Sequence, residues 1–294
     1  ITGASVGLAK RLRIPDDYFT LSQSLAYQYY NLNNYYTGLF PFGDGSSNNL
    51  SYTVALSRNN TFTNPIFPLG GSEFVLSARF SLPYSLWNGV DYANLGDLEK
   101  FQDDDGNPDP AKIEQEKFKW LEFYKIKFKG SWYTRLFDKL VLRTHTEFGF
   151  LGAFNNDRGV IPFDRFFLGG DGMSQYAMDG RETISLRGYP NQSLSSQDGS
   201  TIYNRFSLEL RYPITLKPAA SIFGLTFMET GQGYNNFREF NPFNGKRSVG
   251  LGLRIFMPAF GLLGIDFGYG LDSVNEFNLE PNGWETHFVI GQQF

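Results

Sequence analysis

The 294-residue sequence contains no cysteine and only two histidines, His145 and His287. Without cysteine there is no disulfide framework, no cysteine-based zinc site and no thiol nucleophile. The scarcity of histidine leaves poor odds for histidine-rich metal sites and for serine–histidine catalysis. The net charge of −4 is small for this length, so nothing draws the whole chain towards nucleic acid. The longest apolar stretch, 255–265, is shorter than the ~18 residues that a membrane helix needs, and Pro258 interrupts it.

Aromatic residues and glycine are abundant, and apolar residues recur with a period of two. In the segment 18–30, Phe19, Leu21 and Leu25 fall on one face, and Thr20 and Ser22 fall on the other, as in a β-strand. The same pattern predicts eleven strands, of which the one at 219–231 alternates poorly. Their expected ranges are 3–13, 18–30, 50–58, 72–82, 117–134, 139–151, 201–212, 219–231, 247–257, 262–271 and 284–294.

Alternating strands form either a soluble sandwich or an outer-membrane barrel whose apolar face meets lipid. Three features favour the barrel. The strands are long enough to cross a membrane at a tilt, short turns alternate with long polar loops, and aromatic residues gather near strand ends. The sequence therefore predicts an all-β fold, a transmembrane antiparallel β-barrel.

The strand count is odd, whereas bacterial single-chain barrels normally have an even number. If the short turns are periplasmic, the last strand and the first both run inward, which places residue 1 at the outer surface. The first residues also lack the features of a signal peptide. We therefore expect residues 1–294 to be the C-terminal portion of a barrel, with the first strands absent from this sequence.

The longest loop, 152–200, carries two motifs. One is Phe166-Phe167-Leu168-Gly169-Gly170, and the other is Leu186-Arg187-Gly188-Tyr189. Together with the strand 207–213, the segment 228–231, the strand 250–254 and the terminal aromatic residue Phe294, they resemble the BamA family, the central subunit of the outer-membrane β-barrel assembly machine. The resemblance covers the sixth to the last of sixteen strands and implies N-terminal periplasmic domains outside this sequence.

The resemblance implies that the loop 152–200 folds back into the barrel and that acidic residues on two strands hold the loop arginine. The matching residues are Arg187, Glu209 and Glu229, the last at a position where the family commonly has Asp. A guanidinium buried inside a barrel needs carboxylate partners, and its planar fork suits two of them. Gly188 would let the loop turn tightly beside Arg187. We therefore expect Arg187 to dock on Glu209 and Glu229.

The last strand, 284–294, is the second element that the resemblance singles out. An edge strand with free backbone groups is a template for adding another strand, and in the BamA family client proteins enter at a lateral gate between the first and last strands. Gly291 would weaken pairing locally. The residues expected at this gate are Trp284, Phe288, Ile290, Gly291 and Phe294.

The resemblance therefore implies that the protein is an insertase of the Gram-negative outer membrane, which folds and inserts client barrels. We expect it to be no enzyme and to need no cofactor. Expected partners are nascent outer-membrane β-barrel proteins, accessory lipoproteins of an assembly complex and outer-membrane lipid, but not nucleic acid. Three alternatives remain open: a two-partner-secretion or TamA-like translocation barrel, a passive porin, and an outer-membrane enzyme, which is disfavoured because no convincing nucleophile–base pair stands out.

Two weaker signals have plainer interpretations. The segment 103–109 offers Asp103, Asp105, Asn107 and Asp109 at alternating positions, as in a calcium loop, but the Glu that should close such a loop is missing. A solvated acidic loop is favoured, and no metal site is assigned. His145 lies between Arg143 and Glu147 on the polar face of its strand, where a hydrated ladder of charges is favoured over catalysis.

Overall fold

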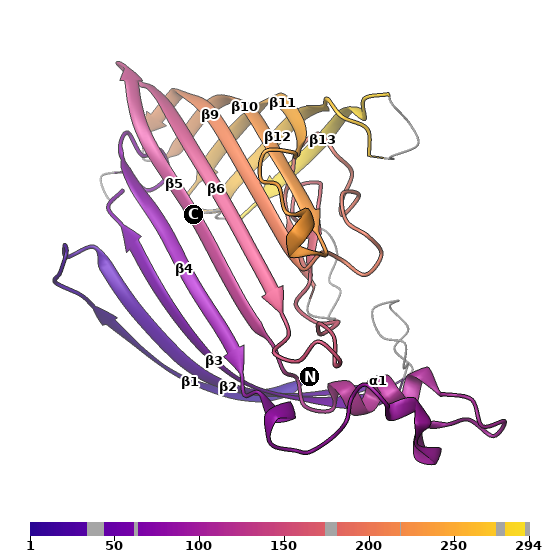
Figure 1. Ribbon diagram of the computed structural model, residues 1–294. Coiled ribbons are helices and arrows are strands. Elements are labelled where there is room, and N and C mark those ends of the chain that lie inside the picture. The colour runs from indigo at the N-terminus through magenta and orange to yellow at the C-terminus, as the bar shows by residue number, and fades with distance from the viewer. Residues whose placement is uncertain (34–43, 62–63, 174–180, 218, 275–279, 292–294) are drawn as a thin grey trace.

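The computed structural model describes the chain except for residues 34–43, 62–63, 174–180, 218, 275–279 and 292–294. Eleven antiparallel strands form one sheet in which each strand pairs with the next (Figure 1). They are β1 (Thr2–Arg11), β2 (Phe19–Leu32), β3 (Gly45–Asn59), β4 (Gly71–Ser81), β5 (Tyr124–Phe137), β6 (Leu140–Gly152), β9 (Ile202–Lys217), β10 (Ala220–Tyr234), β11 (Lys246–Met257), β12 (Gly261–Gly270) and β13 (Gly283–Ile290).

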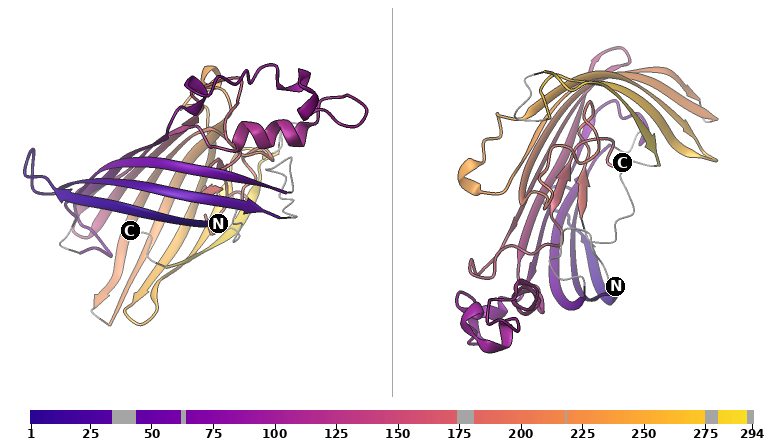
Figure 2. Two further views of the ribbon diagram at one scale, coloured as in Figure 1. Left: turned by 90° about the horizontal axis from the view of Figure 1, so that it is seen from below. Right: turned by 90° about the vertical axis from the view of Figure 1, so that its right-hand side faces the viewer.

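The sheet is strongly curved, and β1 and β13 are its two edges (Figures 1 and 2). Within the part of the chain that is described, these two strands do not pair with each other. The segment between β6 and β9 lies on the concave side of the sheet, as the right-hand view of Figure 2 shows. The sheet is therefore a wall folded around an inserted loop.

The two faces of the wall differ as the alternation predicts. In β9, Glu209 is buried on the concave side, whereas Leu208 and Leu210 are 46% and 40% exposed on the convex side. In β13, His287 is buried on the concave side while Phe288 is exposed on the other. Polar residues thus line the interior, and apolar side chains cover the outside of the wall.

Strand β10 departs from this rule, and the reason is a neighbouring turn. Its inward residues include Phe223, Leu225 and Phe227, which are all buried. They pack against Phe67, which belongs to the turn between β3 and β4 and is 1% exposed, with 5.2 Å between the Phe67 and Phe223 ring centroids. This turn folds under the interior, so the inward apolar residues of β10 pack against protein instead of facing a polar interior.

The strand predicted at 117–134 begins only at Tyr124, because the residues before it form the helix α1 (Pro110–Phe118). The side chain of Asp109 caps this helix by accepting hydrogen bonds from the amides of Ala111 and Lys112. The 3₁₀ helices η1 (Tyr84–Leu86), η2 (Leu95–Asp97) and η3 (Glu99–Phe101) precede it in the same surface region, and η4 (Phe237–Glu239) follows β10. Among the described residues, no helix is long and apolar enough to cross a membrane.

Candidate functional site

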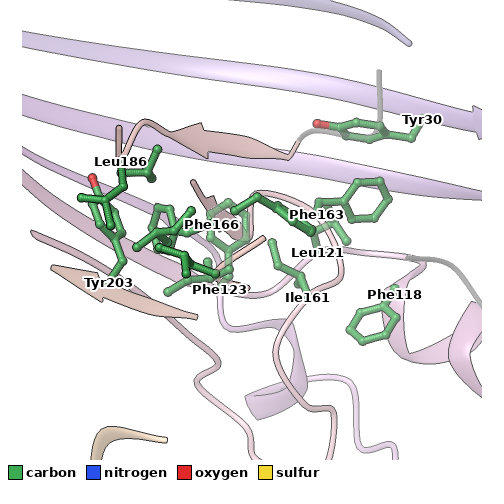
Figure 3. Packing of buried hydrophobic residues seen from close by; sticks show 14 of the residues in the cluster. Tyr30, Phe118, Leu121, Phe123, Ile161, Phe163, Phe166, Leu186 and Tyr203 are labelled. Carbon is green, nitrogen blue, oxygen red and sulfur yellow. The ribbon is translucent and has the colours of Figure 1, made fainter. Parts of the chain in front are cut away.

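The loop between β6 and β9 is folded into the concave side and carries two short strands of its own. Strands β7 (Phe166–Leu168) and β8 (Glu182–Ile184) pair in parallel. The loop packs on the wall through a cluster of buried apolar residues, in which Phe166, Leu186 and Tyr203 meet (Figure 3). Because Leu186 is fully buried here, the residue after it is held at a fixed depth inside the wall.

Arg187 reaches two carboxylates on neighbouring strands. One of its terminal nitrogens, Nη2, lies 2.7 Å from Glu209 Oε1 on β9 and 2.5 Å from Glu229 Oε1 on β10. The backbone amide of Arg187 donates to the second oxygen of Glu229 at 3.0 Å. The guanidinium also lies over the ring of Phe227, 3.7 Å from its centroid. The structure therefore brings together the three residues that the family resemblance grouped.

A third carboxylate completes the arrangement, and sequence reasoning missed it. Asp266 on β12 lies 3.2 Å from Arg187 Nη1 and also accepts from both terminal nitrogens of Arg254 on β11, at 2.7 Å each. The alternation of β12 placed Asp266 among glycines on the polar face. That was a usable signal, since an isolated buried acid requires a cation.

Gly188 is pressed against the wall and held by the last strand. Its φ of +86° is one that glycine adopts without strain, and a Cβ here would lie 2.9 Å from Ser248 Cβ and 3.0 Å from the amide nitrogen of Gly270. The Gly188 amide donates to His287 Nε2 at 2.8 Å. The Gly188 carbonyl accepts from Asn282 Nδ2 at 2.9 Å. Neither His287 nor Asn282 was predicted.

Tyr189 extends the contact to the remaining strand of this part of the sheet. Its ring is fully buried, and its hydroxyl donates to the carbonyl of Arg247 on β11 at 2.6 Å. Burial raises the pKa of Tyr189 to about 12, so the hydroxyl keeps its proton at neutral pH. Residues 187–189 thus touch all five strands from β9 to β13.

A second attachment joins the same loop to the other half of the wall. Lys125 on β5 lies 2.8 Å from Glu182 of β8 and donates to the carbonyl of Asp164 at 2.8 Å. Lys127 also pairs with Glu182, and Arg79 on β4 pairs with Asp164. Burial opposes ionisation of Glu182, but Lys125 and Lys127 outweigh it and leave its pKa below the usual value.

Between the loop and the wall lies a cavity of about 420 Å³ lined by charged side chains from both, among them Lys129, Glu147, Arg205 and Glu182. His145 is buried beside it and bridges Ser131 on β5, at 2.8 Å, to Glu147, at 2.6 Å. Arg205 in turn connects Glu147 to Glu229. The polar side chains from Ser131 through Arg187 to Arg254 thus form one connected network of hydrogen bonds and ion pairs.

Four of the five predicted gate residues lie on β13 or directly after it. Trp284, Phe288 and Ile290 point outward and are 67%, 55% and 67% exposed. The strand predicted over 284–294 ends at Ile290. Gly291 follows it with a φ of +101°, and its amide still donates to the carbonyl of Leu262. Phe294 lies outside the described residues.

The acidic segment 103–109 forms a turn and a helix cap. Asp103 Oδ1 accepts from the amides of Asp105 and Asn107, at 2.9 and 2.8 Å, and Asp109 caps α1. Within the described ranges no group of three or more acidic or histidine side chains is arranged to hold a metal ion.

The polar concave face, the apolar convex face and the inserted loop define a transmembrane antiparallel β-barrel architecture. A family model described as the Omp85 superfamily domain matches residues 2–294, so the chain belongs to the Omp85 superfamily. Barrels of this superfamily are outer-membrane proteins of Gram-negative bacteria.

Two solved structures illustrate the likeness. BamA from Haemophilus ducreyi lacking POTRA domains 1–3 matches with a TM-score of 0.62 and 18% identity, over 98% of this chain and 53% of that one. CdiB from Escherichia coli matches with a TM-score of 0.51 and 12% identity, over 97% of this chain and 44% of that one. No curated protein matches the sequence. At these identities the likeness concerns the fold alone, and the chain spans about half the length of the structures it matches.

Proposed function

We propose that this chain is the barrel of an outer-membrane insertase, which folds client β-barrel proteins and inserts them at a seam beside its last strand. The observation that carries the proposal is the shortness of β13. Its eight residues make it the shortest of the eleven strands described for the sheet, so it offers few backbone hydrogen bonds to whichever strand pairs with its outer edge. A weakly paired strand edge is a place where another strand can be added.

The docked loop supports the same proposal. It contacts every strand from β9 to β13, so it can hold the wall next to the seam in one shape while a client strand pairs with the edge. The proposed action exchanges hydrogen bonds between strands and requires no catalytic group or cofactor. The proposed partners are nascent outer-membrane barrels, accessory lipoproteins of an assembly complex and the surrounding lipid.

Because residues 1–294 contain no cysteine, single cysteines introduced into this part of the protein allow a direct test. Trp284→Cys and Phe288→Cys point outward from β13, and we expect both to form disulfides with alternate cysteines along the last strand of a client. Leu210→Cys is the control, because it also points outward but lies on β9, whose two edges are both paired. Client assembly without any crosslink at β13 would contradict the proposal.

A translocation barrel is the second candidate, favoured by the likeness to CdiB over nearly the whole chain. A polypeptide that is being translocated would pass through the interior of the barrel and would not pair with β13. The side chain of Lys129 is 61% exposed and lines the cavity. Crosslinks of a secreted protein to Lys129→Cys, with none to Phe288→Cys, would decide for translocation.

A further inference from the structure

The tip of the inserted loop is joined to the edge strand by two hydrogen bonds that leave no backbone polar group of Gly188 unpaired. His287 on β13 accepts from its amide, and Asn282, one residue before β13, donates to its carbonyl. His287 is 4% exposed, so water cannot readily replace the contact. The last strand is therefore attached to the loop as well as to β12.

The rest of the loop tip is fixed independently of β13. Arg187 is bound to β9, β10 and β12, and Tyr189 is bound to β11. Gly188 fits between them only because β12 presents glycine at 268 and 270, and a Cβ at Gly268 would lie 2.6 Å from the Gly188 amide nitrogen. The amide of Gly188 is thus a stationary donor against which β13 is positioned.

We propose that His287 is a positioning residue that couples the docked loop to the terminal strand. This inference rests on the proposed function, since it assigns a control to the strand at the proposed seam. The neutral imidazole, with Nε2 unprotonated, holds β13 against β12. Loss of that acceptor frees the strand for exchange with a client strand.

The chemistry of the contact makes the coupling sensitive to protonation. A protonated imidazole carries a hydrogen on both nitrogens, so Nε2 would face the Gly188 amide as a second donor. The charged groups around His287 are Asp266 on β12, Arg187 and Asp171 on the loop, and Glu285 on β13. The hydrogen bond from the Gly188 amide therefore requires a neutral His287 ring, although four charged groups surround that ring.

Two substitutions separate the acceptor from the space that the ring fills. His287→Gln places an amide oxygen near the position of Nε2, which accepts a hydrogen bond at any pH, and His287→Leu fills the site without an acceptor. Thr286→Val is the control, because Thr286 is the neighbouring residue and points outward. Amide hydrogen exchange of 186–189 and 284–290 is measured in the full-length protein in lipid, corrected for intrinsic rates, at pH 7 and pH 5.

We expect His287→Leu to speed exchange in both segments about tenfold at pH 7, and His287→Gln to restore the wild-type rate. The wild type should lose protection at pH 5 while His287→Gln does not. Equal exchange in the wild type and His287→Leu, or equal acid sensitivity in the wild type and His287→Gln, would overturn the coupling. Assembly of a client barrel by the same samples is scored separately, so a wild type that assembles no client refutes the proposed function without touching the exchange result.

Discussion

At the scale of single residues, Arg187 has the largest expected effect on stability. Its removal leaves Glu209, Glu229 and Asp266 buried with fewer cations to neutralise them. Because breaking a buried ion pair typically costs about 3–5 kcal/mol, we expect Arg187→Ala to lower the melting temperature in detergent and to expose the loop 182–190 to exchange. Arg187→Lys keeps the positive charge but loses the planar guanidinium. Its melting temperature and loop exchange should therefore lie between those of the wild type and Arg187→Ala.

The control for this prediction is Arg135→Ala, which removes an exposed arginine from β5 on the same wall. It should leave both the melting temperature and the loop's exchange unchanged. If Arg187→Ala had the same melting temperature and loop exchange as Arg135→Ala, the ion pairs of Arg187 would not be what holds the loop in place.

At the scale of residues, the sequence predicted which side chains face the polar interior better than it predicted which of them contact each other. Arg187, Glu209 and Glu229 were grouped because a family pattern joined them, although up to 42 positions separate their contacts. Asp266 and His287 lie 79 and 99 positions from the residues they bind. Alternation placed both on the polar face, but only the curvature of the whole sheet brings them to the loop tip.

At the scale of elements, the attachment of β8 to β5 should respond to acid. Because Lys125 and Lys127 lower the pKa of Glu182, its ionised form stabilises the docked loop. That stabilisation is complete above the ordinary value of 4.5 and is lost as the pH falls through the lowered pKa. Exchange in 182–186, corrected for intrinsic rates between pH 7 and pH 3, should therefore rise in acid.

Glu182→Gln isolates this effect from the other carboxylates of the interior. The variant should begin with weaker protection at pH 7 and should lose less of it in acid than the wild type. Parallel profiles for the two proteins would assign the acid response to other groups.

The turn between β3 and β4 gives a second prediction at this scale. Phe67→Ala removes a fully buried ring from contact with Phe223 and Tyr133, which typically costs about 3–5 kcal/mol. We expect a lower melting temperature and, because the turn lies under the interior, a higher conductance in planar bilayers. Leu69→Ala, in the same turn but 37% exposed, should change neither. An unchanged conductance in Phe67→Ala would mean that the turn does not close the interior.

The strands themselves were predictable because their period-two pattern reflects a wall between lipid and a polar interior. All eleven were placed, and the weak alternation at 219–231 has its cause in Phe67, a contact between residues more than 150 positions apart. The prediction was wrong over 117–123, because Asp109-Pro110 is a typical helix start and the helix that begins there runs to Phe118.

At the scale of the whole molecule, the convex face determines which solvent the protein tolerates. Leu8, Ile214, Leu251 and Ile290 are each more than half exposed on the wall, and nothing in the described chain covers them. We expect the purified protein to aggregate or unfold when detergent is removed, as measured by sedimentation and circular dichroism. A monodisperse, folded protein in plain buffer would show that a second protein layer, not hydrocarbon, covers this face.

The contact of Phe67 with β10 also limits how the barrel can deform. This contact joins the turn before β4 directly to β10, across the curve that the strands between them follow. The wall between β4 and β10 therefore cannot flatten while the contact is in place. If the proposed insertase moves β13 outward, we therefore expect β11 and β12 to change shape with it. These two strands carry Gly250, Gly252, Gly264, Gly268 and Gly270, most of them near one another across the pair.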